Sequence, residues 1–476
     1  MKKIFLLILG CFIVQGVLAN PASEKSDKKN ILFIAVDDLK PNIGCFGDDI
    51  AITPNIDRLA EQGTVFANNH CQQAVCAPSR ASLLTGLRPD RTEVWDLKTL
   101  IRDKNPDALT MPQYFRKNGY ITAASGKIFD LRSVDKKHDE VSWSIPYEYP
   151  QKPRWLISKG KISVEAPDMA DSNFIDGNIT DQALTNLSKM NKSDKPFFLA
   201  VGYKKPHLPF VAPKKYWDLY NREDFVLHPF QAPAANAPEF ARHRSGELRN
   251  YDDIPYQEKI KDEQQLELIH GYYACVSHID NEVGRLLSAL DSLDLRKNTI
   301  VVFWGDHGWH LGDHGLWCKH SNYEQATRAP LIVSTPEIKG NNISYSPTEF
   351  IDIFPTLCEL TENISPNHLE GQSLVPIMNE SKISVKEFAV SQFHRKGKKE
   401  KLEGYAFRDR RYRYVEWLNI EIRETGDYEN VSVVARELYD YEADPLEKRN
   451  LVDDEGYENI VKEFEQKVKS FFQEFE

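Results

Sequence analysis

Apolar positions in the first 340 residues form short unbroken runs that are typical of buried strands. Residues 31–36 read Ile-Leu-Phe-Ile-Ala-Val, and similar β-rich runs lie at 196–203, 299–304 and 330–334, with a smaller candidate at 120–125. A run that is apolar at every position indicates a strand buried on both faces, as in a parallel sheet covered by helices. The pattern therefore predicts strands of one buried sheet.

Between these runs the chain carries helix signals. Predicted helices at 53–63 and 110–119 have a proline in the first turn and a glycine at the end, which are the expected boundaries. From 266 to 290 an apolar residue returns every three or four positions, which predicts a long helix. Strands separated by helices predict an α/β fold with a mainly parallel sheet sandwiched by helices.

After about residue 380 the pattern changes to alternation. Residues 388–393, 405–417 and 437–441 are typical of short strands with one exposed face. Residues 459–475 predict an amphipathic helix. Its apolar stripe comprises Ile460, Phe464, Val468, Phe471, Phe472 and Phe475. We therefore predict a catalytic domain at 31–380 and a smaller C-terminal α+β domain, containing an antiparallel sheet, at 381–476.

The first thirty residues have the features of an export signal. Two lysines precede the apolar run 4–18, and Val17-Leu18-Ala19 fits a small-residue cleavage site. We expect a signal peptide at 1–19 and a polar leader at 20–30, and thus a periplasmic or secreted protein. Cys11 lies in a weak match to a lipoprotein site. No other apolar stretch is long enough to predict a membrane span.

The composition excludes some classes of partner. The chain has 476 residues, of which 41% are hydrophobic and 28% charged, and its formal net charge is −11. This charge provides no general basic field for a nucleic acid or an anionic membrane, so neither is predicted as a partner. The seven cysteines include no Cys-x-x-Cys pair, so a zinc site is not predicted.

Polar residues follow the predicted strands directly. They are Asp37-Asp38, Gly126-Lys127, Lys204 to His207, and Gly305 to Gly308. Ligands of open parallel sheets bind beyond the carboxyl ends of the strands, so these four clusters predict one shared site.

The acidic clusters predict a metal. Asp37, Asp38, Asp306 and His307 offer three carboxylates and an imidazole, and oxygen-rich sets suit Ca²⁺ or Mg²⁺. Either pair alone would fit a solvated turn or a helix cap. Two such pairs at predicted strand ends favour a divalent metal site.

Residues 76–86 read Cys-Ala-Pro-Ser-Arg-Ala-Ser-Leu-Leu-Thr-Gly. This run resembles the Cys-x-Pro-x-Arg signature of the type I sulfatases in the alkaline phosphatase superfamily, and the order of the strand-end clusters is similar too. Within that family the chain looks most like the iduronate-2-sulfatases, over nearly the whole mature chain. The similar stretches are Ala77–Leu84, Arg88–Asp90, Met111–Lys127, Lys205–Phe210, Cys275–Leu290, Asp306–Trp309, Gly404–Val415 and Glu437–Asn450. The resemblance implies an alkaline-phosphatase-like fold.

The resemblance also implies a role for each matching residue. Cys76 would be converted to formylglycine, whose hydrate attacks sulfate esters, and Arg80 would stabilise that hydrate. Lys127 and Lys319 would hold the sulfate, and His207 would protonate the leaving sugar oxygen. Asp37, Asp38, Asp306, His307 and the residue made from Cys76 would contact the metal, which the family pattern implies is Ca²⁺ rather than Mg²⁺. A formylglycine-generating or anaerobic sulfatase-maturing enzyme would be a partner.

One position departs from the pattern. The iduronate-2-sulfatases have a histidine three residues after the lysine that matches Lys127, and this chain has Asp130 there. His138 is nearby in sequence, but nothing indicates that it replaces the missing imidazole. His310, His314 and His320 surround the Asp306 segment, and surface or supporting roles fit them as well as catalysis.

The predicted substrate is a sulfated oligosaccharide, first of all a uronic acid 2-O-sulfate from a glycosaminoglycan or a similar polysaccharide. A uronate carboxylate needs a basic partner, and Arg88, Lys204, His394 and Arg395 are the candidates. The run 395–401 would equally fit a solvated loop. Two other functions stay open: a phosphomonoesterase or phosphodiesterase of the same superfamily, and a catalytically inactive binding protein.

Overall fold

The computed structural model describes residues 28–147, 149–150, 160–397 and 400–473. The predicted signal peptide and most of the predicted leader lie outside these ranges. Within the described ranges, no helix combines the length and the apolar character needed to cross a membrane.

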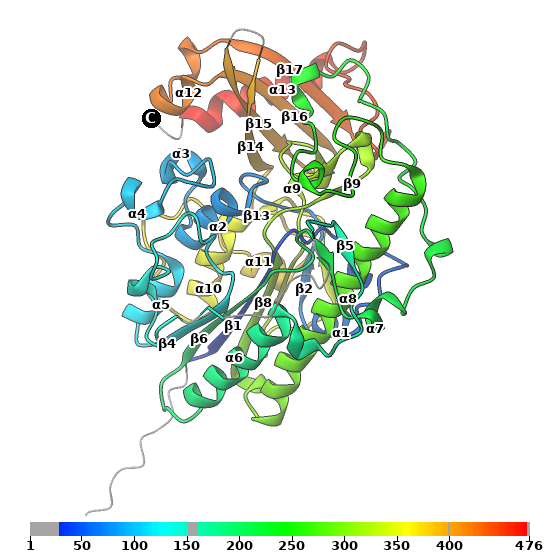
Figure 1. The fold of residues 1–476 in the computed structure, drawn as a ribbon. Helices are drawn as coiled ribbons and strands as arrows, with labels where there is room; N and C mark the ends of the chain where they lie inside the picture. The colour runs from blue at the N-terminus through cyan, green and yellow to red at the C-terminus, as the bar shows by residue number, and fades with distance from the viewer. Residues whose placement is uncertain (1–27, 148, 151–159, 398–399, 474–476) are drawn as a thin grey trace, which may run out of the picture.

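A seven-stranded sheet lies at the centre of the larger part of the molecule (Figure 1). Its middle strand β1 (Asn30–Val36) runs parallel to β6 (Phe197–Tyr203) on one side and to β8 (Thr299–Gly305) on the other. Strand β4 (Ile121–Gly126) pairs in parallel with β6. These four parallel strands end at the same edge of the sheet, which positions the residues that follow them.

The other half of the sheet is mixed. Strand β11 (Leu331–Ser334) is antiparallel to β8 and to β2 (Thr64–Phe66), and β12 (Asn342–Ser344) is parallel to β2. The full order is β12-β2-β11-β8-β1-β6-β4. The five predicted strand segments correspond to β1, β4, β6, β8 and β11.

The side chains on the two faces of the sheet pack into two separate hydrophobic cores. In β1, residues 32, 34 and 36 pack into one core and residues 31, 33 and 35 into the other, as the two-residue period of a strand requires. The first core contains α1 (Pro54–Glu61), α6 (Ile175–Met190) and α8 (Asp262–Ser292). The second contains α2 (Cys76–Thr85), α5 (Met111–Lys117) and α10 (Ile353–Leu360).

A four-stranded antiparallel sheet forms the C-terminal part (Figure 1). Its strands, in spatial order, are β14 (Ala389–Lys396), β15 (Lys401–Arg408), β16 (Tyr412–Asn419) and β17 (Val433–Asp440). Helix α13 (Glu458–Gln473) covers this sheet with the predicted stripe, of which Phe464, Val468, Phe471 and Phe472 are buried. Phe475 lies outside the described residues. The run predicted at 405–417 is a hairpin, because the chain turns between β15 and β16.

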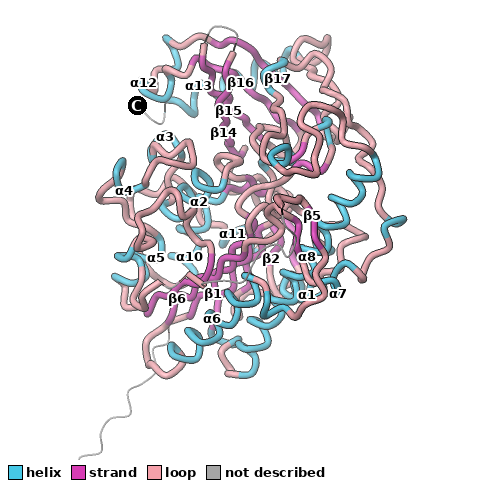
Figure 2. The backbone as a smooth tube through the Cα atoms, viewed as in Figure 1, coloured by secondary structure: helices cyan, strands magenta, loops and turns pink. Residues whose placement is uncertain are grey.

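Short elements and loops connect these layers. Loops fill much of the space between the central sheet and the C-terminal sheet (Figure 2). The short helices are α3 (Pro89–Thr92), α4 (Ile101–Lys104), α7 (Lys214–Trp217), α9 (Glu324–Thr327), α11 (Val375–Asn379) and α12 (Ile422–Thr425). The two-residue strands pair as β3 (Asn69–His70) with β13 (Thr348–Glu349), β5 (Val164–Glu165) with β7 (Phe210–Val211), and β9 (His310–Leu311) with β10 (Trp317–Cys318).

Candidate active site

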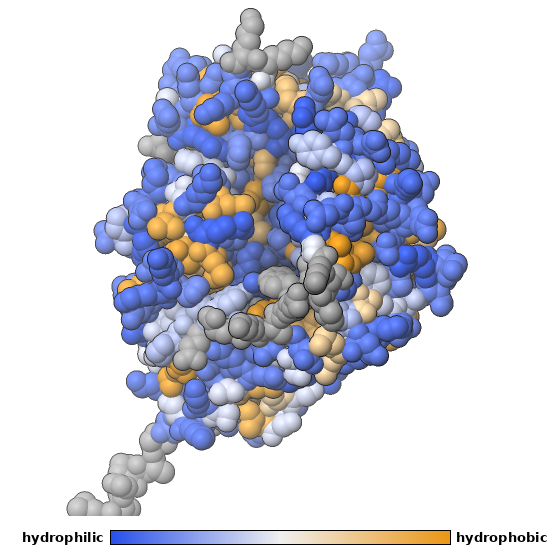
Figure 3. Space-filling model, in the orientation of Figure 1, coloured by the Kyte–Doolittle hydropathy of each residue, from blue (hydrophilic) through white to orange (hydrophobic). Residues whose placement is uncertain are grey.

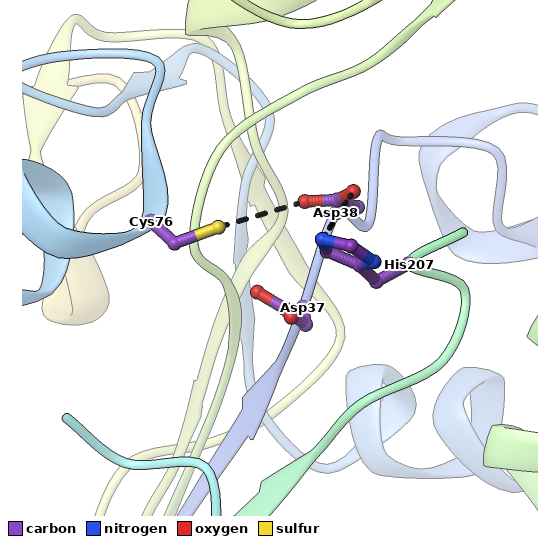
Figure 4. Close-up of side chains that lie close together, drawn as sticks. All are labelled: Asp37, Asp38, Cys76 and His207. Atoms are coloured by element: carbon purple, nitrogen blue, oxygen red, sulfur yellow. Dashed lines mark hydrogen bonds and ion pairs between the residues drawn. The ribbon is translucent and has the colours of Figure 1, made fainter. Parts of the chain in front are cut away.

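The four strand-end clusters meet beyond the carboxyl ends of the parallel strands. Asp37 and Asp38 follow β1, Lys127 follows β4, and Asp306 and His307 follow β8. Helix α2 brings Cys76 to the same place, and His207 reaches it from the segment after β6. Figure 4 shows Cys76, Asp37, Asp38 and His207 around a common space.

The acidic residues form two overlapping groups of metal-type ligands. Asp37, Asp38, Cys76 and His207 offer atoms that all lie within 4.8 Å of one another, and Cys76 forms a second such group with Asp306 and His307. The Nε2 atom of His307 is 3.4 Å from Asp38 Oδ1 and 3.6 Å from Asp306 Oδ1. The three buried carboxylates and the imidazoles of these two overlapping groups fit a hard divalent cation.

Each buried carboxylate also contacts a different basic side chain. Lys127 Nζ lies 2.7 and 2.9 Å from the two Asp37 oxygens, and Lys319 Nζ lies 2.8 and 2.9 Å from those of Asp38. Arg80 Nε donates to Asp306 Oδ2 at 2.9 Å. Buried carboxylates at such short separation require compensating positive charge, and these three pairs supply it.

The charges around Cys76 disfavour a thiolate. Burial raises the pKa of the Cys76 thiol well above its ordinary value, and the carboxylate of Asp37 raises it further against the effect of Lys127 and Lys319. Asp37 behaves in the opposite way: burial raises its pKa, but Lys127 and Arg80 outweigh burial and hold the pKa well below its usual range. An unmodified Cys76 is therefore a protonated thiol beside an ionised carboxylate.

Local sequence explains how two of these residues reach the site. Strand β4 ends at Gly126, which has φ +78° and lies so close to Gly202 that a Cβ would be 2.1 Å from the Gly202 carbonyl oxygen. Only glycine fits there, and the turn that it permits directs Lys127 toward Asp37. Helix α2 begins at Cys76 itself, with Pro78 in the first turn where proline is tolerated.

Glu247 is a site residue that sequence reasoning missed. Its Oε1 atom is 3.0 Å from His207 Nε2, and its Oε2 atom is 3.1 Å from Lys319 Nζ. The other ring nitrogen of His207 lies 2.6 Å from the Leu208 carbonyl oxygen. Because both nitrogens face acceptors, the arrangement suits a doubly protonated ring. No motif surrounds Glu247. Its place in the site depends on a loop conformation that the local sequence does not predict.

Asp130 joins the site as a carboxylate. It lies 3.3 Å from Lys127 Nζ and accepts two hydrogen bonds of 2.8 Å from Arg132, whose side chain is about half exposed. Burial raises the pKa of Asp130, but Arg132 and Lys127 outweigh burial and lower the pKa below its usual range. The ring of His138 instead packs against Tyr147, 4.4 Å between centroids. The position thus presents an Asp–Arg pair in place of the imidazole that the family resemblance led us to expect.

The predicted substrate-binding residues fall into different places. Arg88 lies past the C-terminal end of α2, whereas Cys76 begins that helix, and a ten-residue helix is about 15 Å long. Its guanidinium makes two bonds of 2.7 and 2.9 Å to Glu349. The structure therefore does not bring Arg88 to the Cys76 end of the helix.

Of the other three candidates, Lys204 and Arg395 adjoin segments of the site, and His394 precedes Arg395 in β14. Burial lowers the pKa of Lys204 to about 8, and its Nζ lies 4.8 Å from the centre of the Tyr149 ring. Arg395 donates to the carbonyl oxygen of His320, the residue after Lys319. His394 stacks on Phe393 with 5.1 Å between ring centroids. Through Arg395, strand β14 contacts the turn that carries Lys319.

The additional histidines near Asp306 are engaged in internal contacts. His310 Nδ1 pairs with Asp313, and its Nε2 lies 2.8 Å from Ser321 Oγ. His314 Nε2 lies 3.1 Å from the carbonyl oxygen of Glu447, in the C-terminal part. The contact of His314 ties the loop after β8 to the C-terminal part. The surface shown in Figure 3 is mostly hydrophilic and is hollowed near its centre.

Family models match both parts of the chain. The model described as Sulfatase matches residues 29–364, and the model described as N-sulphoglucosamine sulphohydrolase, C-terminal, matches residues 312–474.

Similar proteins span nearly the whole chain. Iduronate 2-sulfatase of Mus musculus is 33% identical over 96% of this chain and 97% of its own length. Iduronate 2-sulfatase of Homo sapiens is 34% identical over 94% and 95%, respectively. A protein described as a sulfatase from Formosa agariphila is 34% identical over 86% and 84%.

Solved structures share the fold. One, in complex with its substrate D-glucosamine-2-N,6-O-disulfate, has a TM-score of 0.76 at 21% identity and covers 94% of this chain and 98% of its own. A 2-O GAG sulfatase has a TM-score of 0.68 at 24% identity, with 94% and 92% coverage. The phosphonate monoester hydrolase of Agrobacterium radiobacter reaches 0.73 at 20% identity, with 93% and 95% coverage, so the fold alone does not decide the reaction. The predicted mainly parallel sheet with a smaller antiparallel sheet is confirmed.

Proposed function

The chain belongs to the sulfatase family and is a sulfuric ester hydrolase, and from this premise we propose that it removes the 2-O-sulfate of a uronic acid in glycosaminoglycan-derived or similar sulfated oligosaccharides. The observation that carries the proposal is the likeness to two iduronate 2-sulfatases over at least 94% of the chain. The resemblance of a solved 2-O GAG sulfatase in fold agrees with it.

We propose that Cys76 acts as formylglycine. Its Cys-Ala-Pro-Ser-Arg context supports conversion by a maturing enzyme, and the raised pKa of the thiol argues against a thiolate nucleophile. The hydrated aldehyde would supply a nucleophile from which sulfate can be expelled by elimination.

A divalent metal ion fits the carboxylate group, and we propose Ca²⁺ ahead of Mg²⁺. Asp37, Asp38, Asp306 and His307 would hold it, together with the residue made from Cys76. When bound, the ion supplies positive charge that offsets the charge of the sulfate oxygens. Chelation should abolish turnover, and added Ca²⁺ should restore it.

The basic side chains of the site complete the electrostatics. Lys127 and Lys319 are positioned to bind sulfate oxygens. Arg80 pairs with Asp306 and would stabilise the hydrate made from Cys76. A sulfate monoester repels anionic nucleophiles, so positive charge around the transferring group lowers the barrier. The pairing of these cations with Asp37 and Asp38 keeps them in place before substrate binds.

His207 would protonate the leaving sugar oxygen. A sugar alkoxide is a poor leaving group unless it receives a proton as the S–O bond breaks. Glu247 and the Leu208 carbonyl oxygen hold the ring between them, which fixes the nitrogen that faces Asp38 and Glu247. We assign Glu247 to positioning and charging His207.

The uronate carboxylate would contact basic groups at the rim. Lys204, His394 and Arg395 remain candidates, and Arg132 joins them because it is half exposed beside Asp130 and Lys127. Arg88 is a weaker candidate because Glu349 already binds its guanidinium. We also propose export, because residues 1–19 have the features of a signal peptide.

The test compares sulfated disaccharides that differ only in the position of the sulfate. We expect desulfation of the uronic acid 2-O-sulfate at least ten times faster than that of 6-O- and N-sulfated glucosamine isomers. Equal or faster removal of another sulfate would reject the 2-O assignment and leave the sulfatase assignment intact.

Mass spectrometry of the peptide that contains Cys76 tests the nucleophile. We expect an aldehyde in active enzyme and loss of turnover in Cys76→Ser. An unmodified thiol in fully active protein would reject the formylglycine proposal.

A further inference from the structure

A further group of metal-type ligands lies among the helices that cover the sheet, and it shares no residue with the active site. It consists of Asp171, His278 and Glu282. His278 and Glu282 are four residues apart on α8, so they project from the same face of that helix. Asp171 belongs to a 3₁₀ turn (Asp171–Asn173) that leads into α6, and α6 and α8 lie side by side (Figure 1).

The three side chains direct buried polar atoms at one point without bonding to one another. His278 Nε2 is 3.8 Å from Asp171 Oδ1 and 3.9 Å from Glu282 Oε1, which is too long for hydrogen bonds. All three atoms are inaccessible to solvent and lack a hydrogen-bond partner among the described residues. His278 and Glu282 are completely buried. Unpaired buried polar atoms cost free energy, so this arrangement needs something between them.

The surroundings hold the ligand atoms in place. Lys215 binds the other oxygen of Asp171 at 2.5 Å, and Arg285 binds the other oxygen of Glu282 at 2.7 Å. Each carboxylate therefore has one oxygen fixed by a cation and one oxygen turned toward His278. The His278 ring is itself stacked on Tyr216, with 5.1 Å between centroids. Such outer partners are what orients ligands in metal sites.

We propose that Asp171, His278 and Glu282 form a structural Zn²⁺ site. The separations of 3.8 and 3.9 Å, with a third of at most 4.8 Å, place a point equidistant from the three atoms roughly 2.0 to 2.5 Å from each. This range includes the ~2.0–2.2 Å bonds that Zn²⁺ makes with imidazole nitrogen and carboxylate oxygen. One nitrogen and two oxygens leave a fourth tetrahedral position for water. The ion would join the start of α6 to α8, two helices that cover the same face of the sheet.

Zinc content measures the proposal directly. Full-length mature enzyme is stripped with chelator, incubated with Zn²⁺, desalted and analysed by mass spectrometry of its metals. We expect wild type to retain one zinc equivalent that both His278→Phe and Glu282→Gln lose. Phenylalanine keeps the ring that stacks on Tyr216, and glutamine keeps the shape of Glu282, so each variant removes mainly a ligand.

Two controls separate this site from others. His270→Gln changes another buried histidine of α8, whose Nε2 contacts the Trp217 carbonyl oxygen, and it should retain the zinc. Asp38→Asn removes a carboxylate oxygen from the active site. This variant should also keep the zinc equivalent that depends on His278. Zinc should raise the unfolding temperature of wild type and of both controls, because an ion that binds only the folded state stabilises it.

The competing occupant is a single water molecule, which could also join the three polar atoms. In that case wild type would retain no more zinc than His278→Phe and Glu282→Gln, and zinc would leave its unfolding temperature unchanged. Either result would overturn the proposal. If the phenylalanine variant fails to fold, the glutamine variant still gives the comparison.

Discussion

At the scale of single residues, the site depends on how charges are paired before substrate arrives. The three carboxylates of the proposed metal site each touch a different cation, and two of these cations, Lys127 and Lys319, are the groups proposed to bind sulfate. Residue type and strand-end position were enough to predict Asp37, Asp38, Lys127, Asp306 and His307 as neighbours. Glu247 and Arg132 were not predicted, because neither follows a strand or belongs to a motif.

Glu247→Gln should impair the proton donor and leave substrate binding nearly intact. Removing the carboxylate charge removes the partner that favours a charged His207, so we expect kcat on a sugar sulfate to fall 10- to 100-fold with little change in KM. An aryl sulfate with a good leaving group needs no acid and should lose less than threefold. The exposed Glu239→Gln is the control. Equal losses on both substrates would contradict this role.

Asp176 should make stability depend on pH. Burial raises the pKa of Asp176 to about 7, although the amide of Lys204 donates to it at 2.6 Å. The folded state therefore holds its proton above the pKa of the unfolded chain, and stability falls as pH rises from about 4 to 7. At full ionisation the cost is roughly 4 kcal/mol.

The Asp176→Asn variant isolates that effect. Its free energy of unfolding, measured with denaturant between pH 4.5 and 8, should decline less with pH than that of wild type. Parallel pH profiles for the two proteins would show that the Asp176 carboxyl is not the cause.

At the scale of elements, unbroken apolar runs located the buried strands and helical spacing located α8 and α13. Both signals come from local periodicity, which is visible in the sequence without knowledge of the fold. The hairpin of β15 and β16 was predicted only as one run, because Arg408 to Arg411 contain no glycine or proline to mark the turn. The short strands β2 and β12 were not predicted, since three residues carry too little pattern.

Phe464 in α13 should be essential for the C-terminal sheet. Its side chain is almost fully buried and stacks on Tyr414 with 5.3 Å between ring centroids. Phe464→Ala should lower the free energy of unfolding by about 3–5 kcal/mol, the usual cost of such a cavity. The exposed Lys462→Ala on the same helix should change it by less than about 0.5 kcal/mol. Calorimetry that found similar values for the two variants would contradict the packing argument.

At the scale of the whole molecule, the C-terminal sheet is joined to the larger part by hydrogen bonds from its strand β14. Strand β14 donates from its Gln392 and Val390 amides to Gln72 and Glu349, and Ser391 Oγ donates to the Cys71 carbonyl oxygen. Arg395 continues this contact to His320, beside Lys319. The C-terminal sheet therefore contacts the segment before Cys76 and the turn that carries Lys319.

A chain that ends at residue 380 should not fold to an active monomer. Removing β14 would leave the Gln72, Glu349 and Cys71 acceptors without these donors and would expose the apolar residues around them. We expect aggregated or inactive protein in size-exclusion chromatography. A soluble, active monomer would show that residues 381–476 are dispensable.

The sequence by itself determined the family resemblance, the central strands and the candidate nucleophile, because these depend on local periodicity and on contiguous motifs. Only the tertiary structure decided which charges pair, since Glu247 meets His207 and Arg395 meets His320 across many intervening residues. It also separated Arg88 from Cys76 by the length of α2, and brought Asp171 to His278 and Glu282. Such contacts depend on how helices and loops pack, and no local sequence pattern encodes the distance between residues that are far apart in the chain.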